Sequence, residues 1–150
     1  MKTKLFSIRN LLLVATLALM TGCASVPMAP KAQDAASKTF SAPADNMASV
    51  YIYRNSFVGK ALKKTLKIDN VAIGETANGV YFHRSVAPGK HVLATESEFG
   101  DNVLDFTAEA GKNYFFRQYI KMGAFVGGSG LEAVSEEDGK QGVLGCDEAK

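Results

Sequence analysis

ASVYIYR, residues 48–54, is the stretch that decides the fold, because its side chains alternate as those of a β-strand do. Val50 and Ile52 share one face of such a strand, and Tyr51 and Tyr53 share the other. β-Branched and aromatic side chains with a period of two are typical of strands. The folded part of the chain is therefore expected to consist of strands.

Further alternating runs follow, and residues that favour tight turns separate them. The turn pairs are DN at 69–70, NG at 78–79 and PG at 88–89. Asn, Asp and Gly tolerate positive φ, and Pro fixes φ at a value that suits turns. An aromatic strand is expected over residues 113–121 and a last strand over 130–134. About seven short strands predict an all-β fold, a single antiparallel β-sandwich.

One segment carries a helical signal. In SEEDGKQGVL, residues 135–144, Ser135 is placed to cap a helix and Asp138 follows three positions later. Gly139 and Gly142 have low helix propensity. We therefore expect a short C-terminal helix.

The N-terminus has the pattern of a signal peptide. Three basic residues and no acidic one precede a run over residues 11–20 that is apolar apart from Thr16. A membrane-spanning helix needs roughly 20 apolar residues, so this run is too short to span. A basic region before a short apolar region indicates a leader, and we expect residues 1–22 to be removed.

MTGC, residues 20–23, closes this leader and resembles the bacterial lipobox. In lipoproteins the leader is cut before the cysteine, whose sulfur takes a diacylglyceryl group and whose freed amine takes a third chain. The resemblance implies a lipid anchor at Cys23, with Met20 standing where Leu is usual. In Gram-negative lipoproteins an Asp directly after the cysteine implies retention in the inner membrane. Ala24 stands there, which implies the outer membrane, facing the periplasm.

Residues 24–47 are rich in Ala, Ser and Pro and show no sustained periodicity. Such a segment buries too little apolar area to offset the entropy of ordering it. The expected organisation is a signal peptide at 1–22, a lipidated cysteine and flexible tether at 23–47, a β-sandwich domain at 48–144 and a frayed tail at 145–150.

Cys146 lies in that expected tail. Once Cys23 is acylated, Cys146 has no cysteine in the chain with which to form a disulfide. We interpret it as an unpaired, partly exposed thiol, with an interchain disulfide and a nucleophile as alternatives.

Most of the basic character of the chain belongs to the leader. The sequence has 17 basic and 15 acidic residues, and removing residues 1–22 takes away three basic residues and no acidic one. The remaining 14 against 15 give a formal charge of about −1. A strongly basic balance is the global sign of nucleic-acid binding, so nucleic acid is not an expected partner.

Several motifs in order resemble one family of small Gram-negative lipoprotein domains that is known only as a domain of unknown function. They are ASVYIYRNSFVGKA, KIDNVAIG, VAPGKHVLATES, AGKNYFFRQYIKMGAFVGG and LEAVSEEDG. The resemblance implies a β-sandwich similar to PEGA and carboxypeptidase-regulatory modules. It carries over no activity and no catalytic residue.

The glycine-rich segment over residues 122–130 is the candidate binding loop. A phosphate-binding P-loop would need a Lys-Ser/Thr pair and a following helix, and neither follows here. We expect a mobile or bulged connection between strands, in which Phe125 and Val126 form an apolar lip for a partner. The candidate residues are Met122, Gly123, Phe125, Val126, Gly127 and Gly128.

His83 and His91 are the only histidines. A metal site needs more ligands than two histidines separated by a turn, and no serine has a nucleophile-elbow pattern. We interpret both as ordinary strand residues, and we assign no catalytic residue, no metal ligand and no cofactor.

Two further clusters have two interpretations each. Lysines between residues 60 and 67 either protect an edge strand or contact an anionic surface such as lipid headgroups. The aromatic run over residues 113–121 is either two packed faces of the sandwich or a platform for sugars.

These features lead to one expected function and one alternative. We expect a non-enzymatic binding or structural module of the cell envelope, held in the membrane through Cys23, with an envelope protein or a glycan as partner. The alternative is a small envelope enzyme or enzyme inhibitor whose site is the loop over 122–130.

Overall fold

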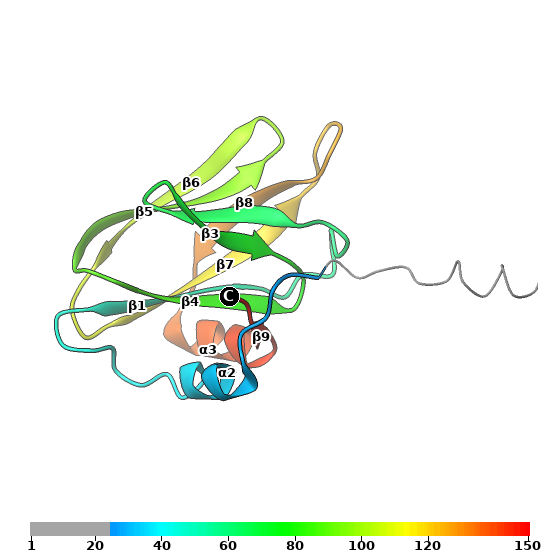
Figure 1. Cartoon of the computed structure of the whole chain (residues 1–150). Coiled ribbons are helices and arrows are strands. Elements are labelled where there is room, and N and C mark those ends of the chain that lie inside the picture. Colours follow the sequence, from blue (N-terminus) through cyan, green and yellow to red (C-terminus); the bar gives the residue numbers. More distant parts are fainter. Residues whose placement is uncertain (1–24) are drawn as a thin grey trace, which may run out of the picture.

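The computed structural model describes residues 25–150, which form two β-sheets and two helices (Figure 1). One sheet has the strand order β8-β7-β1-β4-β9 and the other has the order β3-β2-β5-β6. The elements are α2 (Lys31–Ser37), β1 (Ala48–Arg54), β2 (Lys64–Ile68), β3 (Val71–Thr76), β4 (Val80–Val86), β5 (Gly89–Ser97), β6 (Gly100–Ala108), β7 (Asn113–Lys121), β8 (Gly128–Ala133), α3 (Glu136–Leu144) and β9 (Asp147–Glu148).

The prediction of a mostly β fold with a short C-terminal helix is confirmed. The described residues contain nine strands instead of about seven. The fold is also not wholly antiparallel, because β1 pairs with β7 in parallel and β4 pairs with β9 in parallel. The segment from β2 to β6 separates β1 from β7 in the chain, and such a long connection is what a parallel pair requires.

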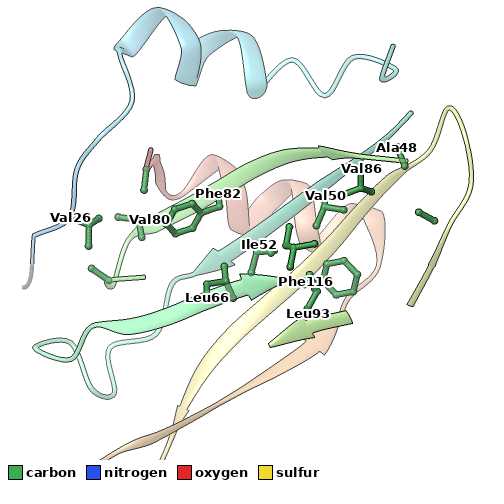
Figure 2. Packing of buried hydrophobic residues seen from close by; sticks show 14 residues of the cluster. Val26, Ala48, Val50, Ile52, Leu66, Val80, Phe82, Val86, Leu93 and Phe116 are labelled. Atoms are coloured by element: carbon green, nitrogen blue, oxygen red, sulfur yellow. The ribbon is translucent and has the colours of Figure 1, made fainter. Parts of the chain in front are cut away.

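The main core lies between the two sheets (Figure 2). Val50 and Ile52 point into it from β1, as the alternation predicts. Leu66 and Leu93 meet them from the opposite sheet, and Phe116 adds its ring from β7. The four aliphatic side chains are at most 1% exposed, so this interface excludes water.

A second apolar cluster lies on the outer face of the five-stranded sheet, the face that the helices cover in Figure 1. Tyr51 and Tyr53 point to it from β1, and α3 contributes Val143. Ser135 caps α3 as predicted, because its side chain accepts a hydrogen bond from the Asp138 amide at 3.1 Å. Both faces of β1 are therefore buried.

The expected flexible tether over 23–47 is wrong for the described residues 25–47. Val26 is buried in the main core, and α2 lies next to β9. Phe40 packs edge-on against Tyr51, with ring centroids 5.5 Å apart. Lys150 donates its amide to the carbonyl of Pro27. Two apolar anchors and distant backbone hydrogen bonds order a segment that has no periodic pattern of its own. Among the described residues, the domain therefore extends back to Val26 and does not start at residue 48.

The expected frayed tail over 145–150 is also wrong. β9 pairs with β4, and Cys146 is 3% exposed. Cys146 is a free thiol whose Sγ lies 3.8 Å from the carbonyl oxygen of Arg54. Burial raises the pKa of this thiol to about 11. The interpretation of Cys146 as partly exposed is thus corrected, and its burial makes it a poor nucleophile.

The turn at 69–70 is confirmed, because Asp69 and Asn70 both have positive φ. Gly79 also has a positive φ, at the turn between β3 and β4. Within the described part of the chain, no helix is long and apolar enough to cross a membrane.

Gly139 provides a test of how α3 packs. A Cβ on Gly139 would overlap the Phe115 side chain, which is 3% exposed. We expect Gly139→Ala to lower the free energy of unfolding by about 1–3 kcal/mol through overpacking. Helix propensity alone would raise it by about 1 kcal/mol. Denaturant unfolding measures the difference in the free energy of unfolding between Gly139→Ala and the parent protein.

Gln141→Ala is the matched control, because Gln141 is exposed on the same helix; its free energy of unfolding should change by no more than about 0.5 kcal/mol. A Gly139→Ala protein as stable as the parent, or more stable, would show that α3 does not approach the sheet this closely.

Candidate functional site

The β7–β8 loop presents the most exposed apolar side chains of the candidate segment. Met122 is 92% exposed and Phe125 is 88% exposed, and Val126 is exposed beside them. The loop is shorter than the expected 122–130, because β8 already begins at Gly128. Gly127 lies against Leu62. Gly127 and Gly128 therefore form the base of the loop.

A carboxylate from a neighbouring turn holds this loop. Glu98, between β5 and β6, accepts hydrogen bonds from the amides of Ala124, Phe125 and Val126 at 2.7, 2.5 and 3.2 Å. Desolvation alone would raise the pKa of Glu98, but the three amide hydrogen bonds together lower it below its ordinary value. The glycine-rich loop does bind an anion through its backbone, and that anion is the protein's own side chain.

Two other loops present apolar side chains beside the β7–β8 loop. Phe99 follows Glu98 in the β5–β6 turn and is 83% exposed, and Phe57 in the β1–β2 connection is 82% exposed. The β1–β2 connection contacts the base of the β7–β8 loop through Gly59, which lies against Ile120. We call this surface the aromatic end. Its members are Phe57, Val58, Phe99, Met122, Phe125 and Val126.

Arg54 fixes the β1–β2 connection from below. Its guanidinium is fully buried, and Nη1 donates to the Leu62 carbonyl at 2.8 Å while Nη2 donates to the Gly59 carbonyl. Among the described residues, no carboxylate forms a salt bridge with it. Backbone carbonyls therefore bind both terminal nitrogens of this cation, while Nε is buried without a hydrogen-bond partner among the described residues. The shape of the loop depends on these two hydrogen bonds.

Lysines flank the aromatic end. Lys60 Nζ lies 5.6 Å from the centroid of the Phe57 ring, and Lys121 Nζ lies 5.5 Å from that of Tyr119. Lys63 and Lys67 instead pair with carboxylates, those of Glu75 and Asp101. The edge-strand interpretation of these lysines is wrong, because β2 lies between β3 and β5. Lys64 is buried, and Lys60 and Lys121 form no salt bridge among the described residues.

His83 lies in a shallow cavity of about 450 Å³ under α2, away from the aromatic end. Its ring stacks on Tyr51 with centroids 4.4 Å apart. Its two nitrogens lie 3.1 and 3.2 Å from the hydroxyls of Ser37 and Ser49, which are both buried. Burial lowers the pKa of His83. Serines occupy both ring nitrogens, so neither nitrogen contacts the carboxylate that a catalytic triad would use.

His91 is held separately by Asp69, whose carboxylate lies 2.6 Å from Nδ1. Desolvation opposes protonation, but the hydrogen bonds to Asp69 and to the Ala87 carbonyl raise the pKa of His91 overall. In the part of the chain that the structure describes, no group of three His, Cys, Asp or Glu side chains could hold a metal ion. Cys23 lies outside the described residues.

Sequence reasoning found Phe125 and missed Phe57, Phe99 and Glu98. Phe57 in NSFVGK and Phe99 in SEFGD are aromatic residues within turns, where apolar side chains stay exposed. That signal was available in both stretches. Glu98 carried no comparable signal, because its role depends on the loop that folds over it.

Comparisons with known proteins give a family and one relative. The family described as "Protein of unknown function (DUF2846)" matches residues 44–129. A protein of Haemophilus influenzae described as "Uncharacterized protein" is 50% identical over 125 residues, which are 83% of this chain and 74% of the relative. No solved structure matches the chain.

Glu98→Gln should release the β7–β8 loop. A glutamine side chain has one acceptor oxygen in place of two, so it cannot bind all three amides as the carboxylate does. We expect hydrogen exchange at Ala124, Phe125 and Val126 to accelerate several-fold, with little change in the melting temperature. Glu109→Gln, an exposed change in the β6–β7 turn, is the control.

Acidification should likewise lower the protection of these three amides in the parent protein, measured relative to intrinsic exchange at each pH. The pKa of Glu98 is lowered on folding, so the stabilisation is present at neutral pH and is lost as the pH falls through that lowered pKa. Equal exchange at these amides in Glu98→Gln and in the parent at neutral pH would contradict this role of Glu98.

Proposed function

The chain belongs to the DUF2846 family of proteins of unknown function, and we propose that it is a lipid-anchored, non-enzymatic binding or structural module of the cell envelope. One observation carries the proposal. The aromatic end exposes six apolar side chains on three loops. Hydrogen bonds that Arg54 donates hold one of those loops in place, and hydrogen bonds that Glu98 accepts hold another. Large apolar side chains that stay exposed on neighbouring loops are typical of an interaction site.

The proposed location follows from the leader and from Cys23. Stable attachment needs at least two acyl chains, which lipidation of the lipobox type supplies. Because Ala24 follows Cys23, we place the protein in the outer membrane, facing the periplasm. Membrane attachment through Cys23, together with an envelope protein or glycan, makes up the proposed set of partners. The mature charge of about −1 argues against nucleic acid.

A second candidate, an enzyme inhibitor, is favoured by the same braced loop. A rigid loop that presents one large apolar side chain is suited to insertion into a partner's cleft. The enzyme alternative has less support, because Phe125 and Met122 point outward and an active site is normally concave.

Cys23→Ser tests the anchor. Serine provides no thiol for a thioether, so the variant should lose palmitate label and leave the membrane fraction. The fold should survive, because the core begins at Val26. Metabolic labelling, fractionation and thermal unfolding measure the three results. A labelled, membrane-bound Cys23→Ser protein would refute the proposed anchor.

Phe125→Ala tests the binding surface. With a photo-crosslinking residue at position 99 in intact cells, we expect crosslinked product to fall several-fold, because an apolar anchor worth about 1.5–3 kcal/mol is removed. The melting temperature should shift by no more than a few degrees, because Phe125 is exposed.

Val103→Ala is the control, since Val103 is 65% exposed on β6; it should leave the crosslinked product unchanged. If Phe125→Ala instead unfolds the domain, Phe125 belongs to the core and the proposed site is wrong.

A further inference from the structure

We infer that the aromatic end is a membrane-contacting face, which inserts its apolar side chains among the headgroups of the same leaflet that holds the lipid on Cys23. This inference rests on the proposed lipid anchor and names the partner of the aromatic end as an anionic bilayer surface. It depends on where the chain enters the domain, on how the exposed side chains are arranged and on the charges around them.

The chain enters the domain at the end that carries the exposed loops. Figure 2 shows Val26 beside Val80, with Ala48 and Val86 at the opposite end. Arg54 is the register partner of Val80, so the β1–β2 connection begins at the Val26 end. The β7–β8 loop lies at this end too. β7 runs parallel to β1, and it continues to Lys121, beyond the pair that Arg117 forms with Tyr53 near the end of β1.

The distance from the anchor to the domain is short. Ala24 and Ser25 alone separate Cys23 from Val26, and three residue steps span at most about 10 Å. Because the segment from Val26 onward is ordered, the link between Cys23 and the domain is short and is not a long flexible tether. A lipid on Cys23 would hold this end of the domain against the bilayer surface.

The apolar side chains project from the domain, as contact with a flat surface requires, and they do not line a groove. The β5–β6 and β7–β8 turns project beyond the sheets (Figure 1). Phe99 and Phe125 sit on these two turns, and each is more than 80% exposed. Apolar side chains such as Phe on projecting loops can be buried at the boundary between headgroups and acyl chains. A small glycan ligand would be better matched by side chains that line a concave site.

The charges complement an anionic surface. Lys60 lies over the Phe57 ring and Lys121 precedes Met122, so both accompany exposed apolar residues. Glu75 and Asp101 are neutralised by Lys63 and Lys67, whereas Glu98 is hydrogen-bonded to neutral amides and keeps its negative charge. Lysines beside a membrane-facing surface are attracted to acidic lipids.

The test uses the absence of tryptophan from the sequence. We propose to introduce Phe125→Trp into the full lipidated chain and to reconstitute it in vesicles of phosphatidylethanolamine and phosphatidylglycerol with brominated acyl chains. The control is Ala110→Trp, which is exposed in the turn next to Gly111. Gly111 donates its amide to Met47, so the control lies at the Ala48 end of the domain.

We expect brominated lipid to quench Phe125→Trp at least about twofold and to leave Ala110→Trp nearly unchanged, because the interfacial depth of an inserted loop is within reach of the bromines. Replacing phosphatidylglycerol with phosphatidylcholine, or introducing Lys60→Glu and Lys121→Glu together, should reduce the quenching. Equal melting temperatures establish that the variants are folded.

Three outcomes are separable. If the protein floats with the vesicles but neither tryptophan is quenched, the anchor stands and the membrane face is wrong, which leaves a protein or glycan partner. If both tryptophans are quenched equally, the domain has no preferred face and the inference is also wrong. If the protein does not float with the vesicles, the proposed lipid anchor itself fails.

Discussion

The burial of both faces of β1 is the constraint on which the other layers depend. On one face, Val50 and Ile52 build the core between the sheets. On the other face, Tyr51 and Tyr53 build the cluster that α3 covers. Because all of β1 is buried, its backbone N–H and C=O groups need hydrogen-bond partners on both edges, which β4 and β7 provide. The residue that ends β1, Arg54, then shapes the loop that carries Phe57.

Local patterns predicted the elements that local chemistry determines. The alternation of residues 48–54 identified β1, the positive φ of Asp69 and Asn70 matched the predicted turn, and Ser135 capped the predicted helix. The segment over 25–47 could not be predicted in this way, because its order depends on partners more than one hundred positions away, such as Glu148 for the amide of Ala29. No periodicity within the segment records those partners.

The candidate site was predictable only in part for a similar reason. Phe125 was visible as an apolar residue among glycines, but Phe57, Phe99 and Glu98 joined the site because three separate turns meet at one end of the sheets. Gly139 and Gly142 gave a misleading signal. They weaken a helix in isolation, yet they let α3 approach Phe115 and Tyr53. Helix propensity describes an isolated helix, whereas packing against the sheet decides whether the helix is stable in the folded domain.

The parallel pairing of β1 with β7 also has a kinetic consequence. Residues of β1 pair with residues more than sixty positions later, from Ser49 with Asn113 to Tyr53 with Arg117. The β2–β3 and β5–β6 hairpins, by contrast, close over short turns. Because distant contacts delay folding, the hairpins form early and the pairing of β1 with β7 forms later. During that interval the apolar, β-prone residues of β1 are open to pairing with other chains, so the folding chain is more prone to aggregation than the native domain.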